Sequence, residues 1–280
     1  MQLSDIAARE VIDVRPSDTT DTAISLMEEH GIHHLPVVED GKPVGIVSDR
    51  DLLESVGWML SVDRTDQHDG RLVGPRFVSD VMSSPVHTLR PDQTITDAAH
   101  LMLQEGIGAV VLAADDKVVG LVAESDVLHC YVDGNAHFSS SRWRFHKVID
   151  HMAANVFSLE PGDPIVRATR LMKEKHLRHV PLVDGDALIG LVSDRDIRQA
   201  AFREHVRWLN DEDGSERVRT NLRDVMSKRP LRVFTTDTLA DVASRMIEAR
   251  IGALPVVNDG HMCGIITETD LLRAFLHGDD

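Results

Sequence analysis

The sequence has little cysteine and no long apolar run, and these absences exclude whole classes of protein. Only two cysteines occur among the 280 residues, so neither a disulfide framework nor a four-cysteine zinc site is available. No apolar run approaches the roughly 18 residues needed to cross a bilayer. The amino-terminal residues lack the basic and apolar segments of a secretory signal. We therefore expect a cytoplasmic protein in a reducing compartment, with no membrane partner.

Positive charge is also scarce. The 30 lysines and arginines are outnumbered by 46 aspartates and glutamates, which leaves a net charge of −16. This balance opposes nonspecific attraction to nucleic acid and to anionic membranes. The motifs GxxxxGK[ST], GxGxxG and HExxH do not occur, and no pattern marks a nucleophile. We therefore expect no nucleic-acid partner, no catalytic residues and no catalytic cofactor, and hence a protein that is not an enzyme.

One seven-residue segment, by contrast, occurs four times. GIVSDRD begins at Gly45, and GLVAESD, GLVSDRD and GIITETD begin at Gly120, Gly190 and Gly264, at offsets of 75, 70 and 74 residues. Each copy has a glycine, a short apolar strand, a small residue, two polar residues and an aspartate, followed by an apolar, helix-like run. We number the units that contain these copies repeats 1 to 4.

The spacing extends well outside the motif. A methionine precedes each motif glycine by 18 residues, and a methionine or alanine lies 20 residues before that methionine. The first set is Met27, Met102, Met172 and Met246, and the second is Ala7, Met82, Met152 and Met226. Spacing kept across four copies predicts four structural units.

Repeat 1 shows what each unit contains. A brief strand is expected at 11–14, and a helix should follow the turn at 16–18 and end at Gly31. Strands are expected at 35–38 and 44–47, joined by an Asp-Gly turn, and a closing helix should begin at Asp49. The fold class is therefore α+β or α/β, built from βαββα units. One sheet face stays unburied in such a unit and needs a partner.

The four repeats form two alternating kinds. Repeats 1 and 3 share SDRD and basic residues before a proline, whereas repeats 2 and 4 share Ile-Gly-Ala and a glutamate in the motif. Long polar linkers, near 61–76 and 210–220, lie inside each pair, and a shorter join at 133–144 lies between the pairs. The pattern predicts a duplicated pair of repeats. The first module is 1–134, with repeats at about 1–57 and 77–132, and the second is 145–280, with repeats at about 145–201 and 222–277.

These features resemble the cystathionine-β-synthase (CBS) domain family, arranged as two tandem Bateman modules. The resemblance is carried by the Asp-Val-Met lead-ins at 80–82 and 224–226, by the pre-proline segments HHLPVV, RHVPLV and GALPVV, and by the repeated glycine motif. It covers nearly the whole chain and implies four βαββα CBS repeats paired into two modules. Such modules usually bind adenosine compounds: AMP, ADP, ATP, S-adenosylmethionine or cyclic dinucleotides.

The motif carries groups that suit a sugar. A fixed carboxylate accepts hydrogen bonds from both hydroxyls of a ribose. The candidate carboxylates are Asp51, Asp126, Asp196 and Asp270, and the candidate hydroxyl residues are Ser48, Ser193 and Thr267. Serine or threonine followed three residues later by an acid is also nearly a capping box, which alone stabilises a helix by about 0.5–2 kcal/mol. Both interpretations stay open for each motif.

Repeats 1 and 3 favour binding, because each carries basic residues upstream that capping does not require. We expect the phosphate to contact His33, His34, Arg50, Arg178, His179 and Arg195. We expect the adenine to lie against Ile32, Leu35, Pro36, Leu177, Val180 and Pro181. Repeat 2 has Ala123 at the hydroxyl position, and repeats 2 and 4 lack the basic residues, so their sites are expected to be empty or to take a ligand without phosphate. No metal site is expected, since the histidines lack cysteine or carboxylate partners at ligand spacing.

The sequence thus predicts a non-catalytic sensor that binds AMP, ADP or ATP between paired repeats and transmits a conformational change to an unidentified protein target. The alternatives are a ligand-free interaction scaffold and a sensor of S-adenosylmethionine or a cyclic dinucleotide. An enzyme acting on nucleotides is a further alternative, but no catalytic constellation supports it. Four repeats closing into a disc within one chain and a homodimer formed through unburied helix faces are both compatible with the pattern.

Overall fold

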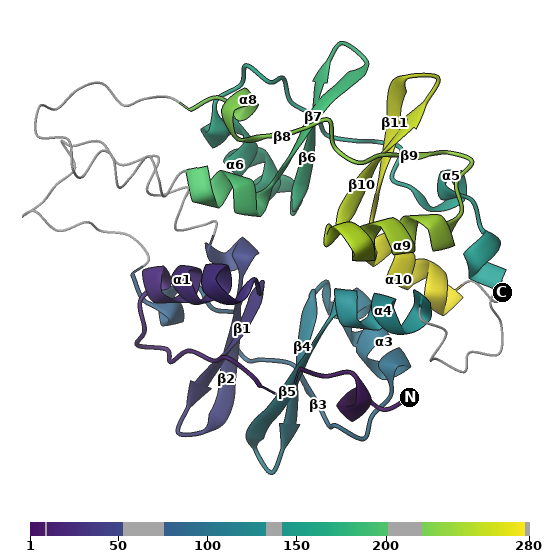
Figure 1. Ribbon diagram of the computed structural model, residues 1–280. Helices are drawn as coiled ribbons and strands as arrows, with labels where there is room; N and C mark the ends of the chain where they lie inside the picture. Colours follow the sequence, from purple (N-terminus) through teal and green to yellow (C-terminus); the bar gives the residue numbers. More distant parts are fainter. Residues whose placement is uncertain (9, 53–75, 133–141, 201–219, 278–280) are drawn as a thin grey trace, which may run out of the picture.

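The structure is a computed structural model that describes residues 1–8, 10–52, 76–132, 142–200 and 220–277 (Figure 1). The expected linkers at 61–76 and 210–220, the join at 133–144 and the later part of the first closing helix fall mostly outside these residues. The elements are η1 (Leu3–Asp5), α1 (Thr20–His30), β1 (His34–Glu39), β2 (Lys42–Ser48), η3 (Val78–Asp80), β3 (Thr88–Leu89), α3 (Ile95–Glu105), β4 (Ala109–Ala114), β5 (Lys117–Ala123), α4 (Glu124–Val132), η4 (Arg142–Phe145), α5 (Val148–His151), α6 (Ile165–Lys175), β6 (His179–Asp184), β7 (Ala187–Ser193), α8 (Leu222–Val225), β8 (Ser227–Lys228), β9 (Val233–Phe234), α9 (Leu239–Ala249), β10 (Ala253–Asn258), β11 (His261–Thr267) and α10 (Glu268–His277). Residues 49–52 and 194–200 are also helical.

The antiparallel hairpin is the constant part of each repeat. The pairs β1–β2, β4–β5, β6–β7 and β10–β11 share one register, and each has an irregularity at the same place, as between Val37 and Val38 in repeat 1. In repeat 1, Asp40 and Gly41 both have positive φ, at 50° and 80°, as a tight hairpin turn requires. The helix before this hairpin ends at Gly31 in a left-handed conformation. The predicted βαββα order is confirmed, except that among the described residues the first strand is present only in repeats 2 and 4, as β3 and β9. In repeats 1 and 3 it is reduced to single bridges, from Val14 to Val37 and from Leu159 to Leu182, so the strand expected at 11–14 is wrong in its extent.

The lead-in segment of each repeat packs on the other repeat of its pair, which the sequence analysis did not predict. Leu3 of repeat 1 lies in the buried cluster of Ile95 and Met102 in repeat 2. Reciprocally, Val78 of repeat 2 lies in the cluster of Val14 in repeat 1. The second pair repeats this exchange, with Val148 in the core of repeat 4 and Leu222 in the core of repeat 3. Each repeat therefore completes the core of its partner.

This exchange explains why the motif begins with glycine. A Cβ atom added at Gly45 would lie 2.8 Å from Sδ of Met82 in the lead-in of repeat 2. Met226 and Met152 occupy the same place at Gly190 and Gly264, and the smaller Ala7 lies at Gly120. The two sets of residues that recur at fixed spacing therefore meet across the pair. A larger residue at the glycine would overpack this contact.

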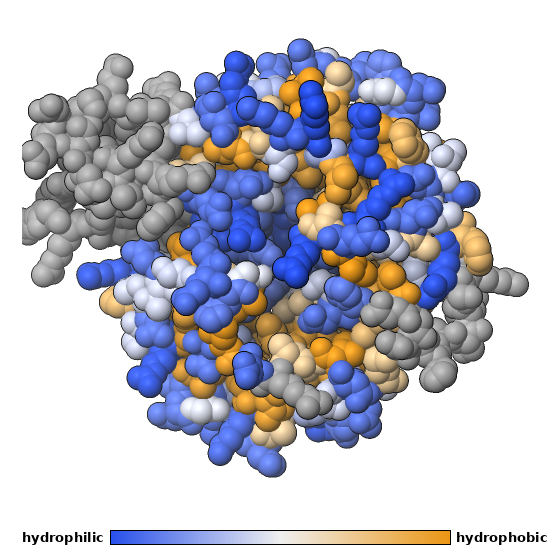
Figure 2. Space-filling model, viewed as in Figure 1, coloured by the Kyte–Doolittle hydropathy of each residue, from blue (hydrophilic) through white to orange (hydrophobic). Residues whose placement is uncertain are grey.

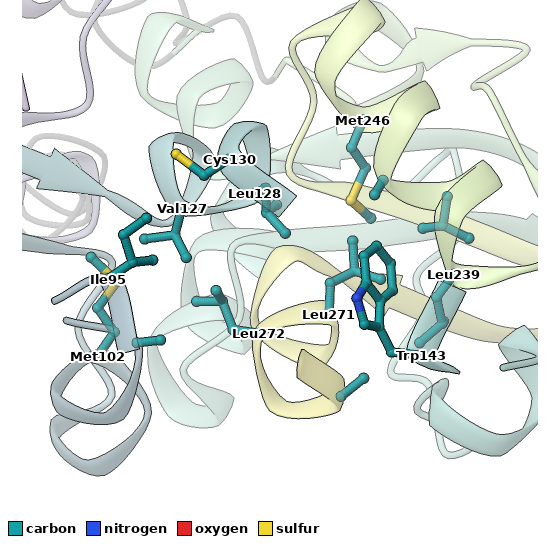
Figure 3. Packing of buried hydrophobic residues seen from close by; sticks show 14 of the residues in the cluster. Ile95, Met102, Val127, Leu128, Cys130, Trp143, Leu239, Met246, Leu271 and Leu272 are labelled. Carbon is teal, nitrogen blue, oxygen red and sulfur yellow. The ribbon is translucent and has the colours of Figure 1, made fainter. Parts of the chain in front are cut away.

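The four repeats lie around a common centre, with repeats 1 and 2 in the lower half of Figure 1 and repeats 3 and 4 in the upper half. Helices α3, α4, α9 and α10 pack together where repeats 2 and 4 meet. One buried apolar cluster runs through both halves and contains Met102, Leu128, Met246 and Leu272 (Figure 3). Apolar helix faces of the two halves are therefore buried against each other within one chain. Among the described helices, none combines the length and apolar character that a membrane span requires.

We expect Gly190→Ala to reduce the free energy of unfolding by about 1–3 kcal/mol, because the new methyl group collides with Met226. In a Met226→Ala background the same substitution should cost less, with a coupling of at least about 0.5 kcal/mol. Urea denaturation of the four proteins of this cycle measures both values. Gly162→Ala is the control, since its Cβ would meet only the guanidinium end of Arg223, at 3.3 Å. Strictly additive costs would show that the methionine does not set the requirement for glycine.

Candidate functional site

The motif aspartates cap the helices that they open. Oδ2 of each accepts the backbone N–H of the residue three positions earlier, at 2.7 Å in Asp51, 2.8 Å in Asp126, and 2.9 Å in Asp196 and Asp270. The hydroxyls of Ser48, Ser193 and Thr267 also donate to these oxygens, at 2.7 Å in each case. The capping box considered in the sequence analysis is therefore formed in repeats 1, 3 and 4. Sugar binding by these residues stays a prediction.

The four motifs differ in what else holds the aspartate. In repeat 4, Oδ1 of Asp270 accepts a hydrogen bond from Nη1 of Arg273 at 3.0 Å. In repeat 2, where Ala123 supplies no hydroxyl, burial raises the pKa of Asp126 despite the N–H of Ala123. Both features make the sites of repeats 2 and 4 less suited to accept hydrogen bonds from a ribose. The expectation that these two sites are empty or take a ligand without phosphate stays a prediction.

A second acidic position of the motif, two residues before the aspartate, was missed by the sequence analysis. The residues are Asp49, Glu124, Asp194 and Glu268. In each repeat the backbone N–H of this residue donates to a carbonyl of the segment just before the hairpin, as from Asp194 to Arg178 at 2.9 Å and from Glu124 to Gly108 at 3.0 Å. These bonds join the helix start to that segment. The sequence did contain a signal for this position, because all four copies of the motif have an acid there.

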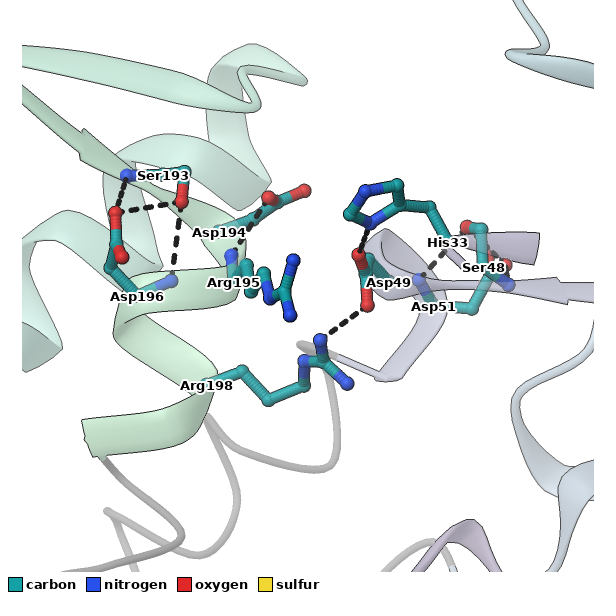
Figure 4. Close-up of polar contacts among 9 residues, drawn as sticks. All are labelled: His33, Ser48, Asp49, Asp51, Ser193, Asp194, Arg195, Asp196 and Arg198. Carbon is teal, nitrogen blue, oxygen red and sulfur yellow. Dashed lines mark hydrogen bonds and ion pairs between the residues drawn. The ribbon is translucent and has the colours of Figure 1, made fainter. Parts of the chain in front are cut away.

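These acids meet charged groups of other repeats. Glu124 Oε2 accepts a hydrogen bond from Nη2 of Arg178, in repeat 3, at 2.6 Å. Asp49 contacts its neighbour His33 and also forms an ion pair with Arg198 of repeat 3 (Figure 4). Arg198 is only 1% exposed, and its Nε and Nη1 have no hydrogen-bond acceptor in the described structure. Hydrophilic residues gather accordingly at the middle of the face drawn in Figure 2.

The alternation between repeats has a steric counterpart at this centre. Gly108 of repeat 2 leaves room for His34 Nε2 and Arg178 Nη1, which would lie 3.1 and 3.2 Å from an added Cβ. Gly252 of repeat 4 likewise leaves room for Glu268, whose Oε2 would lie at 3.1 Å. Repeats 1 and 3 thus supply bulky basic residues, and repeats 2 and 4 supply the space for charged side chains. We refer to these charged and titratable residues and the two glycines as the central cluster: His33, His34, Asp49, Gly108, Glu124, Arg178, Asp194, Arg198, Gly252 and Glu268.

The predicted phosphate contacts are only partly cationic. Burial, together with the charge of Arg178, lowers the pKa of both His34 and His179 to about 3. These two histidines are therefore neutral in the free protein, which corrects the expectation that they act as cations. Arg50 reaches across to repeat 3, where its Nη2 donates to the carbonyl of His176 at 3.5 Å. Figure 4 shows Arg195 beside Asp194 and Arg198, at the boundary between repeats 1 and 3.

The predicted adenine contacts divide into two groups. Leu35 and Val180 have no accessible surface and belong to the cores of repeats 1 and 3. Pro36 and Pro181, which are also buried, lie in the same strands. In this conformation the side chains of these four residues are not exposed to a ligand, which corrects the expectation of direct contact. Ile32 and Leu177 are half-buried and keep accessible surface. Among the described residues, no cluster of histidine, cysteine and carboxylate suits a metal ion.

Two carboxyl groups of the central cluster have raised pKa values, because burial disfavours their charged form. Burial and the charge of Glu124 raise the pKa of Glu268 to about 7, and burial and the charge of Asp49 raise the pKa of Asp194 to about 6. A carboxyl whose pKa rises on folding stabilises the protein at low pH, and this contribution is lost as the pH rises through the folded pKa. For Glu268 the loss extends from about pH 4.5 to about pH 7.

We therefore expect Glu268→Gln to flatten the pH dependence of stability. Between pH 5 and pH 8 the wild-type protein should lose on the order of 1–3 kcal/mol of unfolding free energy relative to this variant, because only the wild type must bury a new charge. Urea denaturation at several pH values measures the difference. Glu39→Gln, at an exposed carboxyl near the tip of a hairpin, is the matched control and should follow the wild type. Parallel curves for the wild type and Glu268→Gln would contradict the expectation.

Comparisons with known proteins agree with this architecture. The CBS-domain model matches residues 3–57, 78–133, 148–203 and 222–277. The chain is 30% identical over 260 residues to an uncharacterised 33.4 kDa protein from a ribosomal RNA operon of Thermofilum pendens, covering 88% of this chain and 81% of that protein. It is 26% identical over 277 residues to the uncharacterised protein MJ1225 of Methanocaldococcus jannaschii, covering 95% of this chain and 96% of that one.

Two solved structures share the fold over nearly the whole chain. The crystal structure of MJ1225, described as a proposed archaeal homologue of γ-AMPK, superposes with a TM-score of 0.83 at 24% identity, covering 98% of this chain and 100% of that one. That of an uncharacterised conserved protein from Pyrococcus horikoshii gives a TM-score of 0.63 at 21% identity, covering 98% and 99%. Because the family model matches most of the chain in four copies, this protein belongs to the CBS-domain family.

Proposed function

We propose that this protein is a non-catalytic regulatory sensor that binds an adenine nucleotide, AMP, ADP or ATP, in clefts between paired repeats. The observation that carries this proposal is the position of Arg50, next in sequence to the candidate sugar ligand Asp51. Arg50 interacts electrostatically with Asp51 and also with Arg178 and Asp194 of repeat 3. A ligand whose ribose lies at Asp51 would therefore have its phosphate near two arginines of different repeats.

We assign each part of the ligand to named residues. The ribose would be held in repeats 1 and 3 by Asp51 and Asp196, with Ser48 and Ser193 beside them. Arg50, Arg178 and Arg195 would bind the phosphate as cations, and the neutral His34 and His179 would supply hydrogen bonds to it. Ile32 and Leu177 would offer apolar surface to the adenine. In repeats 2 and 4, Asp126, Thr267 and Asp270 would accept a ligand without phosphate or none.

We propose that the binding event is transmitted through the contacts between repeats. We keep the division into modules of residues 1–134 and 145–280, because the lead-in exchange joins repeats 1 and 2, and separately repeats 3 and 4. A ligand that binds one arrangement of the repeats more tightly shifts the population toward it, typically by 1–3 kcal/mol of coupling. An unidentified protein target would detect the change. A homodimer is not needed to bury α3, α4, α9 and α10, since these helices pack within the chain.

A ligand-free interaction scaffold is the second candidate. It is favoured by the completeness of the capping boxes, since Asp97 and Asp241 form the same box on Thr94 and Thr238 in helices where no ligand is expected. An aspartate in such a box therefore does not by itself indicate a sugar. A sensor of S-adenosylmethionine or a cyclic dinucleotide differs from our proposal only in the ligand, so the same experiment covers it.

We expect AMP, ADP or ATP to raise the melting temperature, and Asp51→Asn with Asp196→Asn to abolish the rise, because an amide loses the charge that strengthens the bonds to the ribose hydroxyls. Asp97→Asn with Asp241→Asn is the matched control. It weakens the same kind of cap, at a cost of at most about 0.5–2 kcal/mol per helix, but should leave the ligand-induced rise intact. A thermal-shift panel that includes S-adenosylmethionine and cyclic dinucleotides measures these effects.

Three other results would contradict this proposal or the role that it gives to the aspartates. No shift with any adenosine compound would support the scaffold. Equal loss of the shift in both pairs of variants would mean that the aspartates act through helix stability. Consumption of the nucleotide during incubation would show an enzyme.

A further inference from the structure

Glu124 is held by both of its carboxylate oxygens at the meeting point of three repeats. It opens helix α4 of repeat 2 and is 3% exposed. Its Oε2 accepts a hydrogen bond from Nη2 of Arg178 in repeat 3 at 2.6 Å. Its Oε1 accepts one from the hydroxyl of Thr269 in repeat 4 at 2.8 Å. These are short, charge-assisted contacts that fix the carboxylate in one position.

Arg178 serves more than one negative group. Glu124, Glu268 and Asp194 all stabilise its positive charge, from three different helix starts. Glu268 in turn faces Glu124, Arg178, His33 and Asp126. Other charged and titratable groups among the described residues of this region are Asp49, Arg50, Asp51, His34, His179, Arg195 and Arg198. Any anion that takes Arg178 away from Glu124 therefore leaves the buried carboxyl group of Glu124 and the half-buried one of Glu268 without their shared cation.

We propose that Glu124 binds Arg178 at the position that the phosphate of the ligand would take. A phosphate-bearing adenosine compound must therefore displace Glu124 from Arg178. The Glu124–Glu268 pair then takes up a proton. The inference rests on the proposed function and adds to it a residue that sets the discrimination between phosphorylated and unphosphorylated ligands. Arginine binds carboxylate and phosphate with the same planar fork, so the two compete for one position.

The burial of the carboxyl groups explains why a proton is taken up. A buried carboxylate that loses its cation is strongly destabilised in the charged form, and its pKa rises until it binds a proton from solvent. The rise in the pKa of Glu268 to about 7 is consistent with this, because it exists even while Arg178 is present. Since the two carboxyl groups interact, the uptake belongs to the pair and not to either residue alone.

The alternation between repeats fits this role. In repeats 1 and 3 the corresponding residues, Asp49 and Asp194, are one methylene shorter. Asp49 is held by His33 and Arg198, and Arg178 has no hydrogen bond to either aspartate among the contacts described. Glutamate in repeats 2 and 4 supplies the longer side chain, and Gly108 leaves space for Arg178 beside it.

Isothermal titration calorimetry at pH 8 with AMP and with adenosine tests the proposal. The phosphate of AMP is already ionised at this pH, because the second pKa of a phosphate monoester is about 6. We expect Glu124→Gln to bind AMP about five- to tenfold more tightly than the wild type, with adenosine affinity changed by less than about twofold. Glu39→Gln is the matched control and should bind both ligands as the wild type does.

Proton uptake is the readout that a merely structural role of Glu124 would not produce. In two buffers of different ionisation enthalpy, the apparent binding enthalpy of AMP to the wild type should differ by an amount that corresponds to about half a proton or more. The difference should shrink in Glu124→Gln and be absent for adenosine. If Glu124→Gln does not fold, Thr269→Val removes the hydroxyl that holds Oε1, and it should raise AMP affinity by about two- to threefold.

Several outcomes overturn the inference. Unchanged AMP affinity in a folded variant would show that Glu124 does not compete. Equal tightening of AMP and adenosine would show a general loosening of the centre. An apparent binding enthalpy of AMP that is the same in both buffers would exclude the uptake of a proton. If neither ligand binds the wild type, the proposed function fails and this inference with it, whereas binding of AMP without these effects leaves the proposed function intact.

Discussion

The pairing of buried charge across repeats is the constraint on which the centre of this protein depends. Each closing helix begins with an acid that a backbone hydrogen bond joins to the segment before the hairpin. A carboxylate in such a place is stable only with a cation or a proton. Glu124 forms an ion pair with Arg178 of another repeat, and Asp49 forms one with Arg198. Glu268 and Asp194 instead shift toward the protonated form.

This constraint gives the alternation of the repeats a physical meaning. All four motifs place an acid at the centre, and like charges in a poorly solvated site repel strongly unless cations accompany them. Two kinds of unit supply those cations and the space that they need. Repeats 1 and 3 bring histidine or arginine before the hairpin, and repeats 2 and 4 bring glycine there and the longer glutamate at the helix start. The duplicated pair is therefore better suited to a closed ring than four copies of one repeat.

Much of the local structure was predictable from sequence, because each feature depends on residues near one another. The helix end at Gly31 and the turn at Asp40 and Gly41 follow from backbone preferences. The βαββα order follows from periodicity within about fifty residues. The lead-in exchange was not predictable in the same way. Spacing identified Met226 and Gly190 as recurrent, but only the assembled pair shows that they touch.

The site was predicted less completely than the fold for the same reason. The arginines and motif aspartates could be named from residue type and position. Whether a histidine near them carries charge depends on its burial and on Arg178, which lies in a different repeat from His34. The direction in which a strand residue points also decides its role, and Leu35 and Val180 point into the core. The charge of His34 is therefore set only when repeats 1 and 3 meet, whereas the direction of Leu35 and Val180 is set within each repeat but does not follow from residue type alone.

Capping and sugar binding are compatible functions of one aspartate, since a carboxylate has two oxygens and about four acceptor positions. The cap uses Oδ2 in all four motifs. In repeat 4, Arg273 already donates to the second oxygen of Asp270, and in repeat 2 burial raises the pKa of Asp126. A preformed cap would hold the carboxylate of repeats 1 and 3 in position before a ligand arrives, which lowers the entropy lost on binding. The helix start that stabilises the fold is then also the part of the site that needs least rearrangement.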